Sequence, residues 1–185
     1  IVYCATRKEV ERLWEELNAQ SLKALKYHGG MNEAERTANQ EAFIYDKATI
    51  MVATNAFGMG IDKSNVRYVV HYNIPKNIES YYQEIGRAGR DGLPSTCLLL
   101  FSPGDLYTSK FLIEQSTEDE ARKANEYQKL QSMVNYAYTK NCLRQYILHY
   151  FGEEHKGNCG NCSNCNFQGI ITDQTDVAKI IFSGI

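Results

Sequence analysis

Apolar residues gather in five short runs along the first part of the chain. The runs cover residues 1–5, 24–28, 48–53, 67–72 and 96–101, and their length and continuous apolar character are typical of buried strands. Helical spacing, and a capping box formed by Asn32 and Glu35, predict helices over residues 7–20, 32–45 and 78–88. Apolar strands that alternate with helices indicate a parallel sheet covered on both faces. Residues 1–101 are therefore predicted to form a doubly wound α/β lobe.

The pattern changes after Pro103-Gly104. Residues 118–139 are polar and helix-forming with a modest apolar set, and a second helix is predicted over residues 141–151, before a stretch rich in Gly, Asn and Cys. This shift places a domain boundary near residues 102–117. We assign the α/β lobe to residues 1–110 and a small helical subdomain to residues 111–167.

Composition and charge narrow the possible partners. The chain is 43% hydrophobic and 23% charged, which is ordinary for a globular protein. A net charge of −2 and a pI of about 6.1 give no global basic signature, so any nucleic-acid contact must come from a local patch. No apolar run approaches the ~20 residues of a membrane helix, and no membrane partner is expected. Because the chain opens on Ile1 within a predicted strand and closes on an apolar segment, we interpret it as an excised piece of a longer protein.

Polar residues follow three of the predicted strands, at the sheet edge where α/β folds bind ligands. They are Arg7, Gly30, Thr54 and Asn55. Together they would form a groove of amides, hydroxyls and one cation, which suits a sugar-phosphate backbone without base specificity. The alternative is ordinary turn chemistry, for which Thr, Asn and Gly are the usual residues. His28 and His71 are interpreted as structural.

Residues 83–92 carry the strongest local signal for chemistry. If the helix continues through this stretch, Gln83, Arg87 and Arg90 share one face. The small residues between the arginines would let a bulky anion approach, and the guanidinium fork suits phosphate oxygens. We therefore predict that this face binds a nucleoside triphosphate. The alternative is a solvated helix end with surface ion pairs.

A phosphate-binding loop is missing from the sequence. Residues 58–64 end in Lys63-Ser64 and imitate one, but the pattern G-x-x-x-x-G-K-[ST] requires glycine at the positions of Phe57 and Asp62. Arginines without a phosphate cradle suggest half of a composite ATP site, with Arg87 and Arg90 as arginine fingers. Asp62 would either accept from a ribose hydroxyl or cap the turn before Lys63.

Four of the six cysteines lie together near the end of the chain: Cys142, Cys159, Cys162 and Cys165. Three thiols at intervals of three, with one upstream on a helix, suit a tetrahedral Cys₄ zinc site with no open position, so the site is predicted to be structural. Disulfides, an iron–sulfur cluster and replacement of one thiol by His155 are the alternatives. Cys4 and Cys97 lie in strand-like runs and are predicted to be buried.

Several of these stretches resemble one family, the RecQ branch of superfamily 2 helicases. Residues 50–63 resemble its motif V, residues 83–92 its motif VI, residues 1–7 its motif IV and residues 27–31 the segment that follows. The four cysteines resemble the RecQ zinc-binding module in number, spacing and position. Residues 168–185 resemble the start of a winged-helix domain.

The resemblance implies a RecA-like second motor lobe of an ATP-dependent DNA helicase that moves 3′ to 5′ in DNA repair and recombination. It implies that Arg90 is the arginine finger and that Arg87 and Gln83 assist at the γ-phosphate. Gly60 and Asp62 would line the nucleotide, and Arg7, Gly30, Thr54 and Asn55 would contact the DNA backbone.

The implied partners are single-stranded DNA and duplex junctions, with ATP and Mg²⁺ held mainly by a first RecA-like lobe that these 185 residues lack. A winged-helix domain would follow in cis. The implied location is intracellular, in the nucleoid of a bacterium or the nucleus of a eukaryote, and the piece alone is expected to be inactive. The alternatives are a zinc-stapled nucleic-acid-binding module without catalysis and an RNA-directed superfamily 2 helicase.

Overall fold

The structure, a computed structural model, describes residues 1–58 and 61–169. The chain forms two compact units, Ile1–Thr139 and Lys140–Ile185. The predicted winged-helix start at residues 168–185 lies almost entirely outside the described residues. None of the helices among the described residues is long and apolar enough to cross a membrane.

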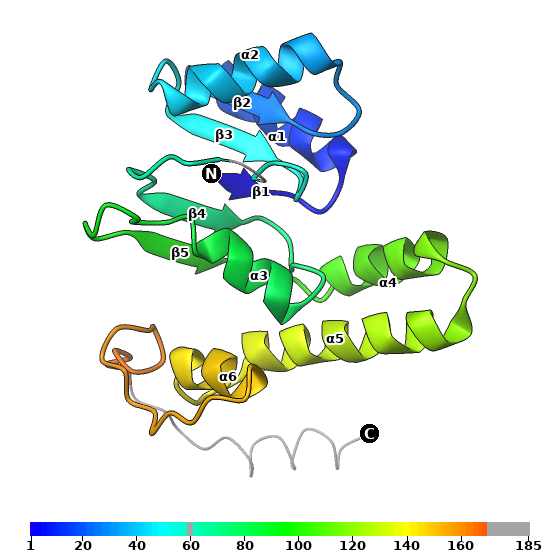
Figure 1. Cartoon of the computed structure of the whole chain (residues 1–185), viewed down its shortest axis with the longest axis vertical. Helices are drawn as coiled ribbons and strands as arrows, with labels where there is room; N and C mark the ends of the chain where they lie inside the picture. Colours follow the sequence, from blue (N-terminus) through cyan, green and yellow to red (C-terminus); the bar gives the residue numbers. More distant parts are fainter. Residues whose placement is uncertain (59–60, 170–185) are drawn as a thin grey trace, which may run out of the picture. The chain divides into compact units, whose positions relative to one another are not determined.

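The first unit is built on a parallel five-stranded sheet with strand order β2-β3-β1-β4-β5 (Figure 1). In the register of the central strands, Tyr3 lies opposite Ala53 on one side and His71 on the other. The strands are β1 (Val2–Tyr3), β2 (Ala24–Tyr27), β3 (Ile50–Ala53), β4 (Tyr68–His71) and β5 (Thr96–Leu99). All five lie within the predicted apolar runs, and the parallel α/β prediction is confirmed.

Helices cover both faces of this sheet, as side-chain alternation along the strands requires. Val52 packs with Val10 of α1 (Arg7–Ala19). Met51, one residue earlier and on the opposite face, packs with Phe43 of α2 (Glu33–Ile44), and α3 (Ile78–Ile85) adds Ile85 to that same core. Figure 1 shows α2 and α3 in front of the sheet and α1 behind it.

The three helices predicted for the lobe begin at or within one residue of the predicted start, because their caps are local. The Thr6 hydroxyl accepts from the Glu9 amide at 3.2 Å, and the Asn32 carboxamide oxygen accepts from the Glu35 amide at 2.8 Å. Each cap satisfies an amide that the first turn leaves without a partner.

The helix predicted over residues 78–88 ends earlier, at Ile85. Gly86 is its C-cap, and Gly89 adopts a φ of +62°. The Gly89 amide donates to the Val66 carbonyl at 2.9 Å, a partner far back in the chain. This tertiary bond turns the backbone out of the helix, so the helical face predicted for Gln83, Arg87 and Arg90 does not exist.

A further helix, α4 (Asp105–Ser116), occupies the stretch predicted as a domain boundary. Its apolar signal is weak, since it buries only Ser109 and Ile113. The Asp105 carboxylate accepts from the side chain of Asn73 at 3.1 Å and from the amide of Ser102 at 3.2 Å. Long-range contacts therefore fix this helix where local sequence does not.

The remaining helices are α5 (Glu120–Tyr138) in the first unit and α6 (Leu143–Tyr150) in the second. Both start and end within the predicted ranges. Of the two cysteines predicted to be buried in strands, one is buried and the other is not. Cys4 is buried as predicted, whereas Cys97 is exposed because β5 is an edge strand of the sheet.

Candidate functional site

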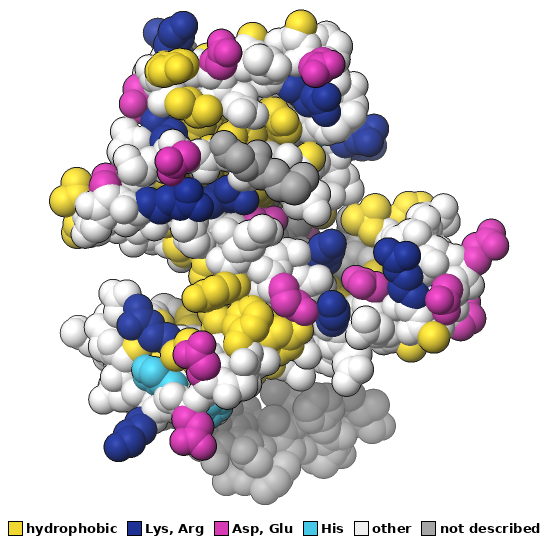
Figure 2. All heavy atoms as spheres, viewed as in Figure 1, with side chains coloured by type: hydrophobic (Ala, Val, Ile, Leu, Met, Phe, Trp, Pro, Cys, Tyr) yellow, Lys and Arg dark blue, Asp and Glu magenta, His cyan; other side chains and the backbone are white. Residues whose placement is uncertain are grey.

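Arg90 is a partly exposed arginine beside the loop that follows β3. Its guanidinium donates to the carbonyl of Ile61 at 3.3 Å and lies 3.5 Å from the Asp62 carboxylate. The side chains are 41% and 94% exposed respectively, so this pair is weak and solvated. Figure 2 shows Lys and Arg side chains gathered on the face where α3 ends. Arg90 can therefore leave its contacts for a stronger anionic partner.

Arg87 is buried and faces a different way. Its Nη1 donates to the carbonyl of Gly58 at 2.6 Å, and its Nε has no hydrogen-bond partner among the described residues. Burial raises the pKa of Tyr3 close by, and the positive charge of Arg87 acts in the opposite direction. The structure thus separates the two arginines, with Arg87 inside the loop and Arg90 at its surface.

Gly58 is required where Arg87 crosses the loop. Its φ is +141°, and a Cβ at this position would lie 2.3 Å from Arg87 Nη2. Asp62 lies further along the same loop, and the next residue, Lys63, fixes the loop to the body of the lobe. Lys63 Nζ is buried and contacts the Asp46 carboxylate at 2.7 Å and the Ile44 carbonyl at 3.3 Å. Gln83 lies exposed on the last turn of α3, and Gly60 lies outside the described residues.

We expect Gly58→Ala to destabilise the first unit by about 1–3 kcal/mol, because the new Cβ displaces Arg87 and φ is unfavourable. Trp14, the only tryptophan, lies in α1, so its fluorescence during urea unfolding reports on this unit. Gly92→Ala is the matched control, since Gly92 has a φ of +79° with nothing within 4 Å of a Cβ. Equal losses in the two variants would show that backbone strain alone matters and that Arg87 is not displaced.

The four residues predicted to bind a sugar-phosphate backbone follow β1, β2 and β3, which are neighbours in the sheet. Arg7 is exposed, and a Cβ on Gly30 would lie 3.2 Å from its Cδ, so the guanidinium stem packs on the Gly30 backbone. Asn55 is exposed. Thr54 is buried, and its hydroxyl accepts from the Ala56 amide at 3.4 Å. The loop geometry therefore brings Arg7 and Gly30 together and leaves Thr54 with a turn contact.

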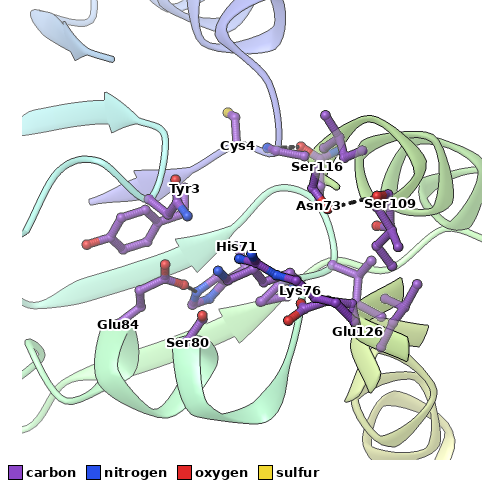
Figure 3. A pocket seen from close by; sticks show the side chains of 18 residues that line it. Tyr3, Cys4, His71, Asn73, Lys76, Ser80, Glu84, Ser109, Ser116 and Glu126 are labelled. Atoms are coloured by element: carbon purple, nitrogen blue, oxygen red, sulfur yellow. Dashed lines mark hydrogen bonds and ion pairs between the residues drawn. The ribbon is translucent and has the colours of Figure 1, made fainter. Parts of the chain in front are cut away.

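A cavity of about 260 Å³ lies at the carboxyl ends of β1 and β4 (Figure 3). His71 lines it and contacts Glu84 at 2.7 Å through Nε2, while its Nδ1 has no partner among the described residues. Tyr3 stacks on the His71 ring at 5.4 Å. Helices α4 and α5 close the other side with Ile113 and Leu130. Sequence reasoning missed the cavity because it depends on α4.

The second unit contains the four-cysteine cluster. The sulfurs of Cys142, Cys159, Cys162 and Cys165 all lie within 4.8 Å of one another. Two of the pairs are 4.0 Å apart, near the ~3.8 Å edge of a tetrahedron with zinc–sulfur bonds of about 2.3 Å. All six cysteines are free, so the disulfide alternative is wrong.

Backbone amides support ionised sulfur in this cluster. Desolvation opposes ionisation of Cys162, but hydrogen bonds from the backbone of Cys165 and Leu143, together with those from the thiols of Cys165 and Cys159, lower the pKa of this thiol to about 6. The Leu143 amide donates to Cys162 Sγ at 3.4 Å, as the Cys162 amide does to Cys159 Sγ. Amide donors of this kind orient thiolate ligands. The donor set fits structural zinc.

Comparisons with known proteins match two successive stretches of the chain. Residues 1–92 match the family described as Helicase conserved C-terminal domain, and residues 103–166 match the RecQ zinc-binding family. The chain is 51% identical over its whole length to the ATP-dependent DNA helicase RecQ of Bacillus subtilis. It is 44% identical over 86% of its length to the protein of that name in Pasteurella multocida.

The chain spans 31% and 25% of the lengths of these two relatives. Among solved structures, a DEAD box protein from Methanococcus jannaschii aligns with a TM-score of 0.52 and 30% identity, over 62% of this chain and 31% of that one. Strands β1 to β4 and the arginines therefore lie in the stretch that matches the helicase family, and the four cysteines lie in the stretch that matches the RecQ zinc-binding family. The chain belongs to the RecQ family of helicases.

Proposed function

We propose that this chain is the second motor lobe and zinc module of an ATP-dependent DNA helicase that moves 3′ to 5′ and acts in DNA repair and recombination. The observation that carries the proposal is the pair of arginines after α3. Arg90 is loosely held at the surface, and Arg87 is buried with an unpaired Nε among the described residues. The exposed guanidinium of Arg90 can reach a phosphate oxygen directly, whereas Arg87 would need the loop at Gly58 to shift before its N–H groups could do so.

The sequence has no phosphate loop of its own, so a first RecA-like lobe in cis would hold ATP and Mg²⁺. Closing of the two lobes would bring Arg90 to the γ-phosphate, where an arginine finger stabilises the charge of the transferring phosphoryl group. Arg87 and Gln83 would assist there, and Gly60 and Asp62 would line the nucleotide. The direct test is DNA-stimulated ATP hydrolysis by the full-length protein. Binding of DNA without hydrolysis would instead support the non-catalytic module.

The DNA would cross the loops after β1, β2 and β3. On this edge Arg7 would supply a cation, Asn55 and Thr54 would supply polar groups, and Gly30 would allow the close approach of Arg7; such contacts grip a backbone without selecting bases. Repeated closing and opening of the lobes would move the strand past these loops. The proposed partners are single-stranded DNA and duplex junctions, and the proposed location is intracellular. The division into residues 1–110, 111–167 and 168–185, the last beginning a winged-helix domain, remains part of the proposal.

We expect Arg7→Ala to weaken single-stranded DNA binding by the full-length protein about three- to tenfold, equally for all sequences. Loss of one phosphate contact should also reduce the slope of log K against log salt by about 0.7. Fluorescence anisotropy at several salt concentrations measures both quantities. Lys23→Ala removes an equal charge before β2, at the opposite edge of the sheet, and should leave the slope unchanged. An unchanged slope for Arg7→Ala would remove this residue from the proposed DNA track.

A further inference from the structure

A buried histidine follows β2, and both of its ring nitrogens are engaged. His28 is 6% exposed. Its Nε2 lies 2.8 Å from the Glu11 carboxylate on α1. Its Nδ1 accepts a hydrogen bond of 3.1 Å from the amide of Gly30. One ring therefore joins a helix to the loop that carries Gly29 and Gly30.

These partners select one tautomer. The Gly30 amide can only donate, so Nδ1 must be unprotonated. The Glu11 carboxylate can only accept when ionised, so Nε2 must carry the proton. Partial desolvation opposes ionisation of Glu11, but hydrogen bonds from Lys26 and His28 lower its pKa. The neutral ring with hydrogen on Nε2 satisfies every group that it contacts.

The ring sets the geometry of the loop beneath Arg7. A Cβ on Gly30 would lie 3.2 Å from His28 Nδ1, 3.2 Å from Arg7 Cδ and 3.3 Å from Arg7 Nη1. Gly30 thus lies between the imidazole and the arginine. Its amide is already donated to His28, so Gly30 contributes close packing for Arg7 in place of an amide for phosphate. The guanidinium of Arg7 stays exposed at the sheet edge.

We propose that His28 is a positioning residue for DNA binding: through Nδ1 it fixes the Gly30 amide, and the Gly29-Gly30 backbone in turn holds Arg7 where it contacts a DNA phosphate. The inference rests on the proposed function, because it requires that Arg7 contacts DNA. The bond that matters is the one to Gly30. The bond to Glu11 agrees with this tautomer but is not required for it, because the Gly30 amide alone selects an unprotonated Nδ1. Glu11 is also held independently by Lys26 at 2.8 Å.

Two substitutions separate the two ring nitrogens. His28→Asn places a carboxamide oxygen near the position of Nδ1 and keeps an acceptor for Gly30, but it cannot reach Glu11. His28→Gln places an amide donor near the position of Nε2 and keeps the Glu11 contact, but it leaves the Gly30 amide without its acceptor. We expect His28→Gln to weaken single-stranded DNA binding about tenfold, and His28→Asn to stay within about threefold of the parent.

The measurement is fluorescence anisotropy with a labelled oligonucleotide and the full-length helicase, with Trp14 fluorescence during urea unfolding as a check of folding. The double variant Arg7→Ala with His28→Gln should bind no more weakly than Arg7→Ala alone, because both changes act on one contact. A merely structural role would give additive losses. If His28→Gln does not fold, Glu11→Ala takes its place. That variant leaves Nδ1 as an acceptor and should bind DNA within about threefold of the parent, and a larger loss would overturn the proposal.

Equal losses in the Asn and Gln variants, or parent-like binding by His28→Gln, would overturn the positioning role. If Arg7→Ala weakens binding while His28→Gln does not, only this inference fails and the DNA track stands. If Arg7→Ala has no effect, the track through this loop fails and the inference fails with it. DNA-stimulated ATP hydrolysis then reports separately on whether the protein is a helicase.

Discussion

We expect replacement of Arg90 with alanine to lower DNA-stimulated ATP hydrolysis by the full-length protein about 10³–10⁵-fold, and to leave ATP affinity within a few fold. Among the described residues, Arg90 is held by backbone carbonyls at 3.3 Å and by an exposed carboxylate at 3.5 Å, so little is lost when its side chain moves to a phosphate. Its charge matters most when negative charge develops on the transferring group. The effect should therefore fall on the rate of hydrolysis and not on binding.

Single-turnover hydrolysis and binding of a fluorescent ATP analogue measure the two quantities separately. Arg90→Lys keeps the charge but loses the planar fork, and should recover only part of the rate. Arg67→Ala is the control, because Arg67 also lies near the end of motif VI but is bound to Asp91 and to the carbonyl of Pro94. Retained turnover in Arg90→Ala would exclude the finger assignment. An equal loss of ATP affinity would show that Arg90 binds the ground state.

The α/β lobe could be predicted because its signals are local and repeated. Each apolar run forms one strand, and neighbouring residues such as Met51 and Val52 pack in cores on opposite faces of the sheet. The caps at Thr6 and Asn32 involve residues three apart. Such patterns need no knowledge of distant parts of the chain.

The errors occur where distant residues decide the local structure. The helix over residues 78–88 is cut short by the bond from Gly89 to Val66, and α4 depends on the bonds of Asp105 to Asn73 and the loop around it. The spacing of apolar residues along a helix carries no information about either of these contacts. A weak amphipathic pattern combined with an acidic residue, Asp105, in the first turn is the signal that could have indicated α4.

The candidate site divides in the same way. A phosphate-binding role for the arginines and a zinc-binding role for the cysteines could be predicted, because both depend on residue identity and on short intervals in the sequence. The burial of Arg87 against Gly58 and the bond of His28 to Glu11 could not, since their partners lie 29 and 17 residues away. Arg87 and Arg90 were therefore predicted to share one environment, although Arg87 is buried and Arg90 lies at the surface.

Removal of zinc from the cluster should unfold the second unit and leave the first intact. The described part of that unit contains only one helix, α6, and a loop with three of the four ligands. A segment with so little core depends on its metal, and structural zinc binding supplies about 10–16 kcal/mol in small zinc domains. The first unit has its own core around Met51 and Phe57. The two units should therefore respond differently to a chelator.

We expect Cys162→Ser to lose the bound zinc, from about one ion per chain to a small fraction of that, because three remaining thiolates hold the ion much more weakly. Metal analysis gives the stoichiometry, and limited proteolysis should then cut within residues 140–167. The urea midpoint reported by Trp14 in the first unit should not change. Cys97→Ser is the matched control, since Cys97 is an exposed cysteine on β5 outside the cluster, and it should keep its zinc. Stoichiometric zinc in Cys162→Ser would show that Cys162 is not a ligand, and would return His155 as the candidate for the fourth position.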